Sequence, residues 1–185
     1  MMRVTKVLGV TLLLSTAIWG IKNQPTEAVV TADGTVYFAL PPSLVKTRTA
    51  YRDPAVPSTY YFTLSLPSQA GEPLQRVTFT QYKGLENIEF DLKHTEAEAE
   101  TLTNSEQRLT LVEVTRDRQT KTVSVTFNPP VLPGRTVTIG LHARSNPLHG
   151  GVYLFGVKAF PAGEKSYGQF LGYGRLQFLV PGSRL

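Results

Sequence analysis

Three histidines, His94, His142 and His149, have the widest chemical range of any residues in this sequence. His142 and His149 flank a turn and, with Arg144, form a predicted polar turn cluster. A zinc or copper site needs three or four ligands in a defined geometry. The chain has no cysteine, and its two methionines stand at the N-terminus, so the turn lacks such a ligand set. The sequence therefore predicts no metal site and no cofactor.

The carboxylates and serines form no catalytic motif. A glycosidase needs two carboxylates that flank a cleft, whereas Glu89 and Asp91 share one outward face of a predicted strand. Glu96, Glu98 and Glu100 lack the ligand spacing and the turning glycine of a calcium loop. The sequence contains no Gly-x-Ser-x-Gly elbow and no phosphate-binding or dinucleotide-binding glycine motif. We predict no catalytic residue, although a Ser-His-Asp triad assembled from distant segments stays open.

Tyrosines give the strongest indication of a binding function. Exposed tyrosines can stack on sugar rings or anchor protein partners; alternatively, most are partly buried with the hydroxyl at the edge of the core. Segment 152–160 is apolar on both faces, so it is either a covered central strand or a hydrophobic patch for a partner. We predict partner contacts at Tyr153, Phe155 and Tyr61, and either an envelope protein or a glycan as the partner.

The elements that must position these residues are strands, because hydrophobicity from residue 35 onward has a period of two. Such alternation places one face of a strand on a core and the other in water. The predicted strands are 36–38, 60–66, 77–80, 88–92, 109–115, 122–127, 136–141, 152–160 and 175–180. Segment 41–59 is predicted as a proline-rich loop, and 93–107 as one or two helical turns or a solvated loop.

The stretch 128–134, Asn-Pro-Pro-Val-Leu-Pro-Gly, is a rigid connector that ends in a Pro-Gly turn. Its place between two predicted strands suits a chain that crosses from one sheet of a sandwich to the other. The fold prediction is all-β: an immunoglobulin-like two-sheet β-sandwich of about seven to nine strands, preceded by a signal-peptide helix. We divide the chain into a signal peptide, 1–28, and a β-sandwich domain, 29–185.

The N-terminus has the three parts of a signal peptide. Arg3 and Lys6 precede an apolar run over 7–21, and small residues precede a cut after Ala28 or after Ala32. A helix over that run spans about 22 Å, which is less than the roughly 30 Å of a hydrocarbon core. We therefore expect export to the periplasm or the medium, with the thylakoid lumen as an alternative, and no membrane span after cleavage.

The charge of the chain does not indicate a nucleic-acid partner. The whole chain of 185 residues has a net charge of +5. Cleavage after residue 28 removes three of 19 basic and one of 14 acidic residues, which leaves a net charge of +3. A charge that small does not make the basic footprint of a nucleic-acid-binding surface.

Several runs of residues together resemble one family. They are 127–134 (Phe-Asn-Pro-Pro-Val-Leu-Pro-Gly), 136–141 (Thr-Val-Thr-Ile-Gly-Leu), 150–157 (Gly-Gly-Val-Tyr-Leu-Phe-Gly-Val), 159–163 (Ala-Phe-Pro-Ala-Gly) and 171–176 (Leu-Gly-Tyr-Gly-Arg-Leu). Over 32–180 the chain resembles the exported cyanobacterial family called domain of unknown function 2808. The resemblance implies export, a β-rich fold and a cyanobacterial source, and it implies no activity. We predict a non-enzymatic binding or structural module of the cyanobacterial cell envelope; a carbohydrate-active or other hydrolase is the alternative.

Overall fold

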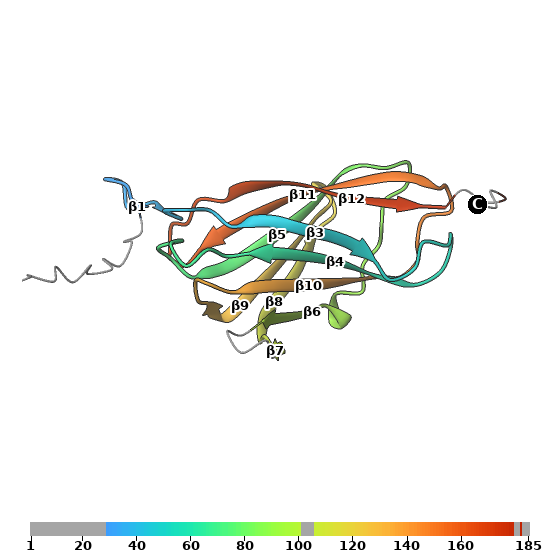
Figure 1. The fold of residues 1–185 in the computed structure, drawn as a ribbon. Coiled ribbons are helices and arrows are strands. Elements are labelled where there is room, and N and C mark those ends of the chain that lie inside the picture. Colours follow the sequence, from blue (N-terminus) through green and yellow to red (C-terminus); the bar gives the residue numbers. More distant parts are fainter. Residues whose placement is uncertain (1–28, 101–105, 180–181, 183–185) are drawn as a thin grey trace, which may run out of the picture.

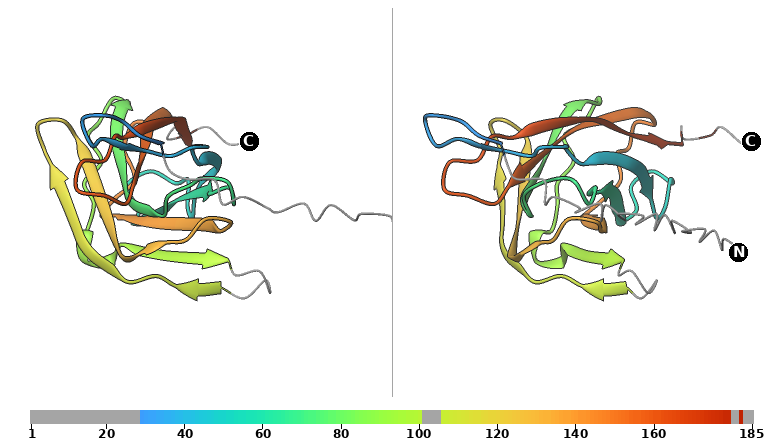
Figure 2. Two further views of the ribbon diagram at one scale, coloured as in Figure 1. Left: turned by 90° about the vertical axis from the view of Figure 1, so that its left-hand side faces the viewer. Right: turned by 60° about the vertical axis from the view of Figure 1, so that its left-hand side comes forward.

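The computed structural model describes residues 29–100, 106–179 and 182, and over these residues it confirms the immunoglobulin-like two-sheet β-sandwich (Figure 1). The strands run antiparallel in two five-stranded sheets, which face each other as two layers (Figure 2). The predicted signal-peptide helix lies outside the described residues. No helix in the described part of the chain is long and apolar enough to span a membrane.

The first sheet has the order β3 (Ser43–Thr49), β4 (Ser58–Ser65), β10 (Thr136–Ala143), β6 (Glu96–Glu100) and β7 (Glu106–Arg108). The second has the order β12 (Gln169–Phe178), β11 (Gly151–Pro161), β5 (Leu74–Lys83), β9 (Thr122–Val131) and β8 (Leu111–Asp117). A separate ribbon pairs β1 (Val29–Val30) with β2 (Val36–Tyr37), and η1 (Leu92–His94) is a single 3-10 turn.

The core lies between the sheets and contains aromatic rings from both. Phe62 of β4 packs on Phe79 of β5 with 4.6 Å between ring centroids, and on Phe155 of β11 with 5.8 Å. All three side chains are at most 1 % exposed. Burial of each stabilises the fold by about 1.5–3 kcal/mol, so interleaved rings across the layers hold the two sheets together without disulfides.

The predicted crossing between the sheets is confirmed, since β9 belongs to the second sheet and β10 to the first. At the crossing, the amide of Gly134 donates to the carbonyl of Leu66 at 2.9 Å. The predicted strands 109–115 and 122–127 correspond to β8 and β9, which pair with each other.

Three local predictions were wrong. Segment 41–59 contains β3, a charged edge strand. None of its side chains is fully buried, and those that are partly buried are spaced too irregularly to give a period-two signal. Segment 93–107 has a helical turn only at its start, in η1, and residues 101–105 lie outside the described residues. The rest contains β6, in which Ala97 and Ala99 are buried between outward glutamates, so the helical propensity of Ala and Glu yields to sheet pairing. Segment 88–92 is not a strand: Ile88 and Phe90 are buried, but only an isolated bridge joins Phe90 to Ala143.

Candidate functional site

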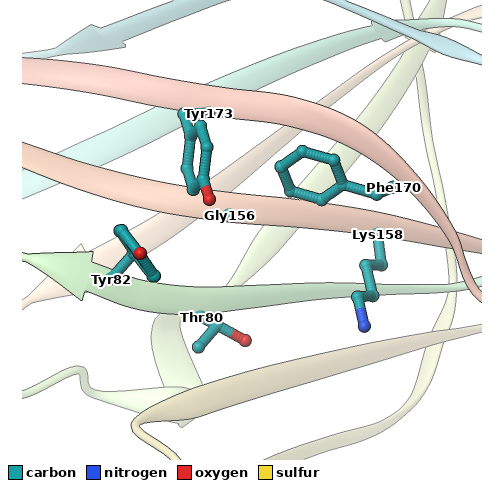
Figure 3. Close-up of a pocket in the computed structure, with 6 residues that line it drawn as sticks. All are labelled: Thr80, Tyr82, Gly156, Lys158, Phe170 and Tyr173. Carbon is teal, nitrogen blue, oxygen red and sulfur yellow. The ribbon is translucent and has the colours of Figure 1, made fainter.

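Three exposed aromatic side chains lie together on the outward face of the second sheet, and we call them the aromatic cluster: Tyr82, Phe170 and Tyr173 (Figure 3). They are 70 %, 52 % and 49 % exposed. The Tyr173 ring centroid lies 5.2 Å from that of Tyr82 and 5.1 Å from that of Phe170. Mutual ring contacts of this kind contribute about 0.5–1.5 kcal/mol each, so they hold the rings in place over the sheet.

The aromatic cluster surrounds an open hollow of about 320 Å³ whose floor is the sheet itself. Gly156 on β11 forms the floor, because it has no side chain to fill the space between the rings. Thr80 and Lys158 complete the lining with a hydroxyl and an ammonium group. The Thr80 hydroxyl also lies 2.8 Å from that of Thr122 on β9, which fixes its position.

Strand pairing explains why these residues meet. Gly156 pairs with Tyr173 of β12 on one side and with Thr80 of β5 on the other, so the three share one row across the sheet. Lys158, two residues further along β11, pairs with Phe170. The edge strand β12 therefore brings two rings to the hollow, and β5 brings the third.

Sequence reasoning missed all three members of the aromatic cluster. A strand was predicted over 77–80; extending its alternation by two residues buries Gln81 and turns Tyr82 outward, as observed. Phe170 and Tyr173 were missed because the last strand was predicted over 175–180, which excludes both residues. β12 in fact begins at Gln169 and includes both rings.

The predicted partner-binding residues lie elsewhere. Tyr153 and Phe155 are each 1 % exposed and point into the core, which corrects the expectation that they meet a partner. The reason is that β11 is covered on its inner face by the first sheet. Tyr61 is half-buried on the outward face of the first sheet, with the Arg48 guanidinium 3.9 Å above its ring. A partner contact at Tyr61 stays a prediction.

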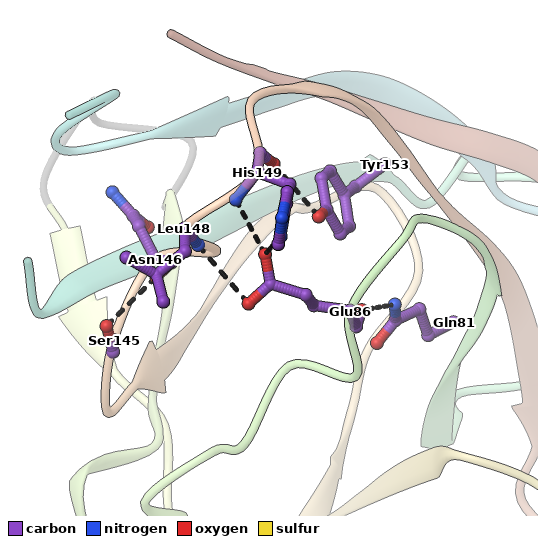
Figure 4. A network of polar contacts seen from close by, with 7 residues as sticks. All are labelled: Gln81, Glu86, Ser145, Asn146, Leu148, His149 and Tyr153. Atoms are coloured by element: carbon purple, nitrogen blue, oxygen red, sulfur yellow. Dashed lines mark hydrogen bonds and ion pairs between the residues drawn. The ribbon is translucent and has the colours of Figure 1, made fainter. Parts of the chain in front are cut away.

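The polar turn cluster is divided between different surroundings. His149 donates its backbone amide to Glu86 at 2.6 Å, and its Nδ1 lies 2.8 Å from the same carboxylate oxygen (Figure 4). These contacts hold the pKa of the Glu86 carboxyl below its ordinary value, chiefly through the bond from the His149 amide. His142 instead lies 5.7 Å from His94, measured between ring centroids. The network around Glu86 ties two loops together, because Glu86 and His149 are 63 residues apart in the sequence.

Arg144 lines a second hollow of about 370 Å³, which also contains Glu89 and Asp91. Glu89 forms an ion pair with Arg116. Asp91 lies 2.9 Å from His94 Nδ1, and this contact is the main reason that the pKa of Asp91 is lowered. A glycosidase general acid needs a raised pKa. Glu89 and Asp91 therefore serve as counter-ions to the basic side chains around them, and Asp91 lacks the raised pKa of a general acid.

No group of three or more histidine, aspartate or glutamate side chains within 29–100 and 106–179 is placed to hold a metal ion. Glu96, Glu98 and Glu100 of β6 alternate with the buried Ala97 and Ala99 and therefore point to the opposite face of the strand. The hollow at the aromatic cluster is lined by a threonine hydroxyl, an ammonium group and three aromatic rings, without a carboxylate or a histidine.

Fold and site together define an immunoglobulin-like β-sandwich domain that carries an open aromatic surface on one sheet. Residues 35–178 match the family model described as "Protein of unknown function (DUF2808)", and the chain belongs to this family. The resemblance found in the sequence is thereby confirmed. Among the curated proteins, none matches the chain in sequence.

Among solved structures, similar folds occur in bacterial surface proteins. The 35 kDa C-terminal fragment of the major pilin GBS80 of Streptococcus agalactiae is 8 % identical with a TM-score of 0.50, over 74 % of this chain and 56 % of that one. The pilus 2b backbone protein of group B streptococcus is 8 % identical with a TM-score of 0.47, over 72 % and 56 %. The collagen adhesin of S. aureus is 10 % identical with a TM-score of 0.43, over 72 % and 48 %. This chain thus spans about half of each, and the likeness concerns the fold alone.

Proposed function

We propose that the chain is the precursor of an exported, non-enzymatic binding module of the cyanobacterial cell envelope, and that the aromatic cluster is its contact surface. One observation carries the proposal: Tyr82, Phe170 and Tyr173 leave about half or more of their surface in water, yet they converge on one hollow. A convergence of rings around a hollow is typical of a ligand site, whereas single exposed apolar residues are ordinary.

The rigidity of the surface favours binding. Two of the rings stand on β12 and one on β5, and both strands pair with β11 along most of its length. A ligand that stacks on these rings orders few side chains, because the rings already contact one another. Preorganisation of this kind reduces the entropy lost on binding.

The composition of the hollow favours binding over catalysis. Its lining contains no carboxylate and no histidine, so its threonine, lysine and tyrosines have no such neighbour in the lining to activate them as nucleophiles. The hydrolase alternative would need the hollow with Glu89 and Asp91, but there one carboxylate is paired with an arginine and the other has a lowered pKa. These features support a binding module.

The test is co-sedimentation of the purified protein with the insoluble envelope fraction of the cells that produce it. We expect wild type to sediment with the envelope and the triple variant Tyr82→Ala, Phe170→Ala, Tyr173→Ala to stay in the supernatant. Tyr51→Ala is the matched control, because Tyr51 is 61 % exposed and lies outside the cluster. If the triple variant keeps the wild-type melting temperature and still sediments like wild type, the proposal is wrong.

A further inference from the structure

Resting on the proposed function, we infer that the ligand of the aromatic cluster is an acidic polysaccharide, one whose sugar rings carry carboxylate or sulfate groups. The inference combines three features of the outward face of the second sheet. These are the small size of its apolar area, the hydroxyl groups beside it, and the sign of the charge around it.

The apolar part of the site matches a sugar ring in size and shape. It consists of three rings around a single shallow hollow, with glycine at the floor. A pyranose has an apolar face of C–H groups and a rim of hydroxyls, so it stacks on an aromatic ring while its rim reaches polar groups. A stable protein interface instead needs a broad buried core with few charges, over roughly 1,000 Å² or more in total.

The sheet beside the aromatic cluster carries hydroxyl groups in place of apolar side chains. Thr80 and Thr78 of β5 pair with Thr122 and Ser124 of β9. All four side chains are half-buried, so their hydroxyls face the surface without standing clear of it. From β12 to β8 this face spans four strand spacings, about 19 Å. Such a flat polar face beside stacked rings suits an extended sugar chain that lies across the strands.

The charge at the aromatic end of the face is positive. Lys158 is exposed within the lining of the hollow, and its cross-strand partners are Phe170 and Thr78. Arg76, two residues from Thr78 on β5, places its guanidinium 4.2 Å from the Phe160 ring centroid, and its buried Nε has no hydrogen-bond partner among the described residues. Within the described part of the chain, neither cation forms an ion pair.

Among the five strands of the second sheet, acidic residues occur only on the opposite edge strand. Glu113 and Asp117 belong to β8, which is two strands from β5 and three from β11. That separation is about 10–14 Å, which exceeds the screening length of about 8 Å in physiological salt. Lys158 and Arg76 therefore lack acidic neighbours in the sheet, and an anionic group on the ligand supplies the missing partner.

The experiment compares polymers that share a backbone and differ in charge. The purified protein is titrated with polygalacturonate and its methyl-esterified form, and with dextran sulfate and dextran, by isothermal calorimetry in 20 mM and 500 mM NaCl. We expect one charged polymer to bind about tenfold or more tightly than its neutral counterpart at low salt. Which pair shows the difference distinguishes carboxylate from sulfate recognition.

Two variants separate the charge from the rings. Lys158→Ala is expected to weaken binding of the charged polymer about tenfold and to leave the neutral polymer unaffected. Lys46→Ala is the control, since Lys46 is an exposed lysine on the first sheet. Tyr173→Ala is expected to abolish binding of both polymers. Each variant is first shown to melt like wild type, so that a loss of binding reports the site and not the fold.

Other outcomes are equally decisive. Equal binding of charged and neutral polymers that Tyr173→Ala abolishes would overturn the acidic ligand but leave the proposed function in place. Binding of neither pair, or binding of a proline-rich peptide at the aromatic cluster in their place, would also overturn it. Envelope co-sedimentation then decides separately whether the aromatic cluster is a contact surface at all.

Discussion

Two glycines on neighbouring strands provide a sharp test of the sheet geometry that builds the site. Gly156 of β11 faces outward and forms the floor of the hollow, whereas Gly174 of β12 is buried and faces the core. A Cβ added at Gly156 would meet Phe170 at 3.4 Å and Tyr173 at 3.6 Å, which is ordinary contact. A Cβ added at Gly174 would lie 2.7 Å from Phe62 Cε1 and 2.9 Å from Thr47 Oγ1.

These distances predict stability changes of opposite sign. Gly156→Ala removes backbone freedom from the unfolded chain without a clash and should stabilise the fold by about 0.5–1 kcal/mol. Gly174→Ala forces Phe62 to move, and that ring is fully buried between Phe79 and Phe155. Overpacking of this kind costs about 1–3 kcal/mol, which outweighs the same backbone gain.

The assay is thermal unfolding followed by circular dichroism, with urea titration as a second measurement. One kcal/mol corresponds to about 2–4 °C for a chain of this length. We expect the melting temperature of Gly156→Ala to be equal to or above that of wild type, and that of Gly174→Ala to be several degrees lower. Destabilisation by both substitutions, or by Gly156→Ala alone, would refute the outward placement of Gly156 and with it the floor of the hollow.

Three further predictions concern the loops and the leader. Asn146→Ala should destabilise the fold by about 3 kcal/mol or more in urea unfolding, because Asn146 is 2 % exposed, accepts from the Tyr60 hydroxyl and donates to two loop carbonyls. The lowered pKa of Glu86 means that its contribution to stability is complete above the ordinary value of 4.5 and is lost as the pH falls through the lower folded pKa. The stability difference between wild type and Glu86→Gln should therefore be larger at pH 7 than at pH 3, and an unchanged difference would contradict the role of the bonds from His149. Mass spectrometry of the exported protein should show cleavage after Ala28, which keeps β1; a mature protein that still contains the leader would refute the proposed signal peptide.

The sandwich could be predicted because most of its strands alternate over a single half-buried core. β4 follows the rule without exception, with Tyr60, Phe62 and Leu64 fully buried. The rule fails at β3, because an edge strand buries little, and at β6, because alanine is small enough to be buried yet is read as helix-forming. Local propensity is a weak prior, and strand pairing overrides it at both positions.

Tyrosines could not be assigned to core or surface by counting them. Tyr60 and Tyr153 are buried, whereas Tyr82 and Tyr173 are exposed, although all four stand in strands. What distinguishes them is whether each tyrosine lies an even or an odd number of residues from a buried side chain of the same strand, because successive side chains point to opposite faces. Tyr82 stands three residues after the buried Phe79, so a regular strand turns it outward. The sequence therefore holds the signal for this member of the aromatic cluster.

The rest of the aromatic cluster depends on an irregularity that simple alternation does not reveal. Phe170 and Tyr173 are three residues apart, so in a regular strand they would face opposite sides of the sheet. The register between β11 and β12 shifts by one residue between Val157 and Lys158, because Val157 pairs with Gly172 and Lys158 with Phe170. Leu171 is the extra residue of this bulge and packs against the core, and Gly172 adopts a φ of +124°, which glycine tolerates.

The bulge thus gives β12 the same outward face for both rings. Without it, Phe170 would point into the core and Tyr173 would stand without its second neighbour. Bulges commonly re-aim a side chain beside a binding site, and this one creates the only place on the described part of β12 where two rings share a face. The common orientation of Phe170 and Tyr173 therefore depends on one backbone irregularity in an edge strand, opposite the glycine that leaves the floor open.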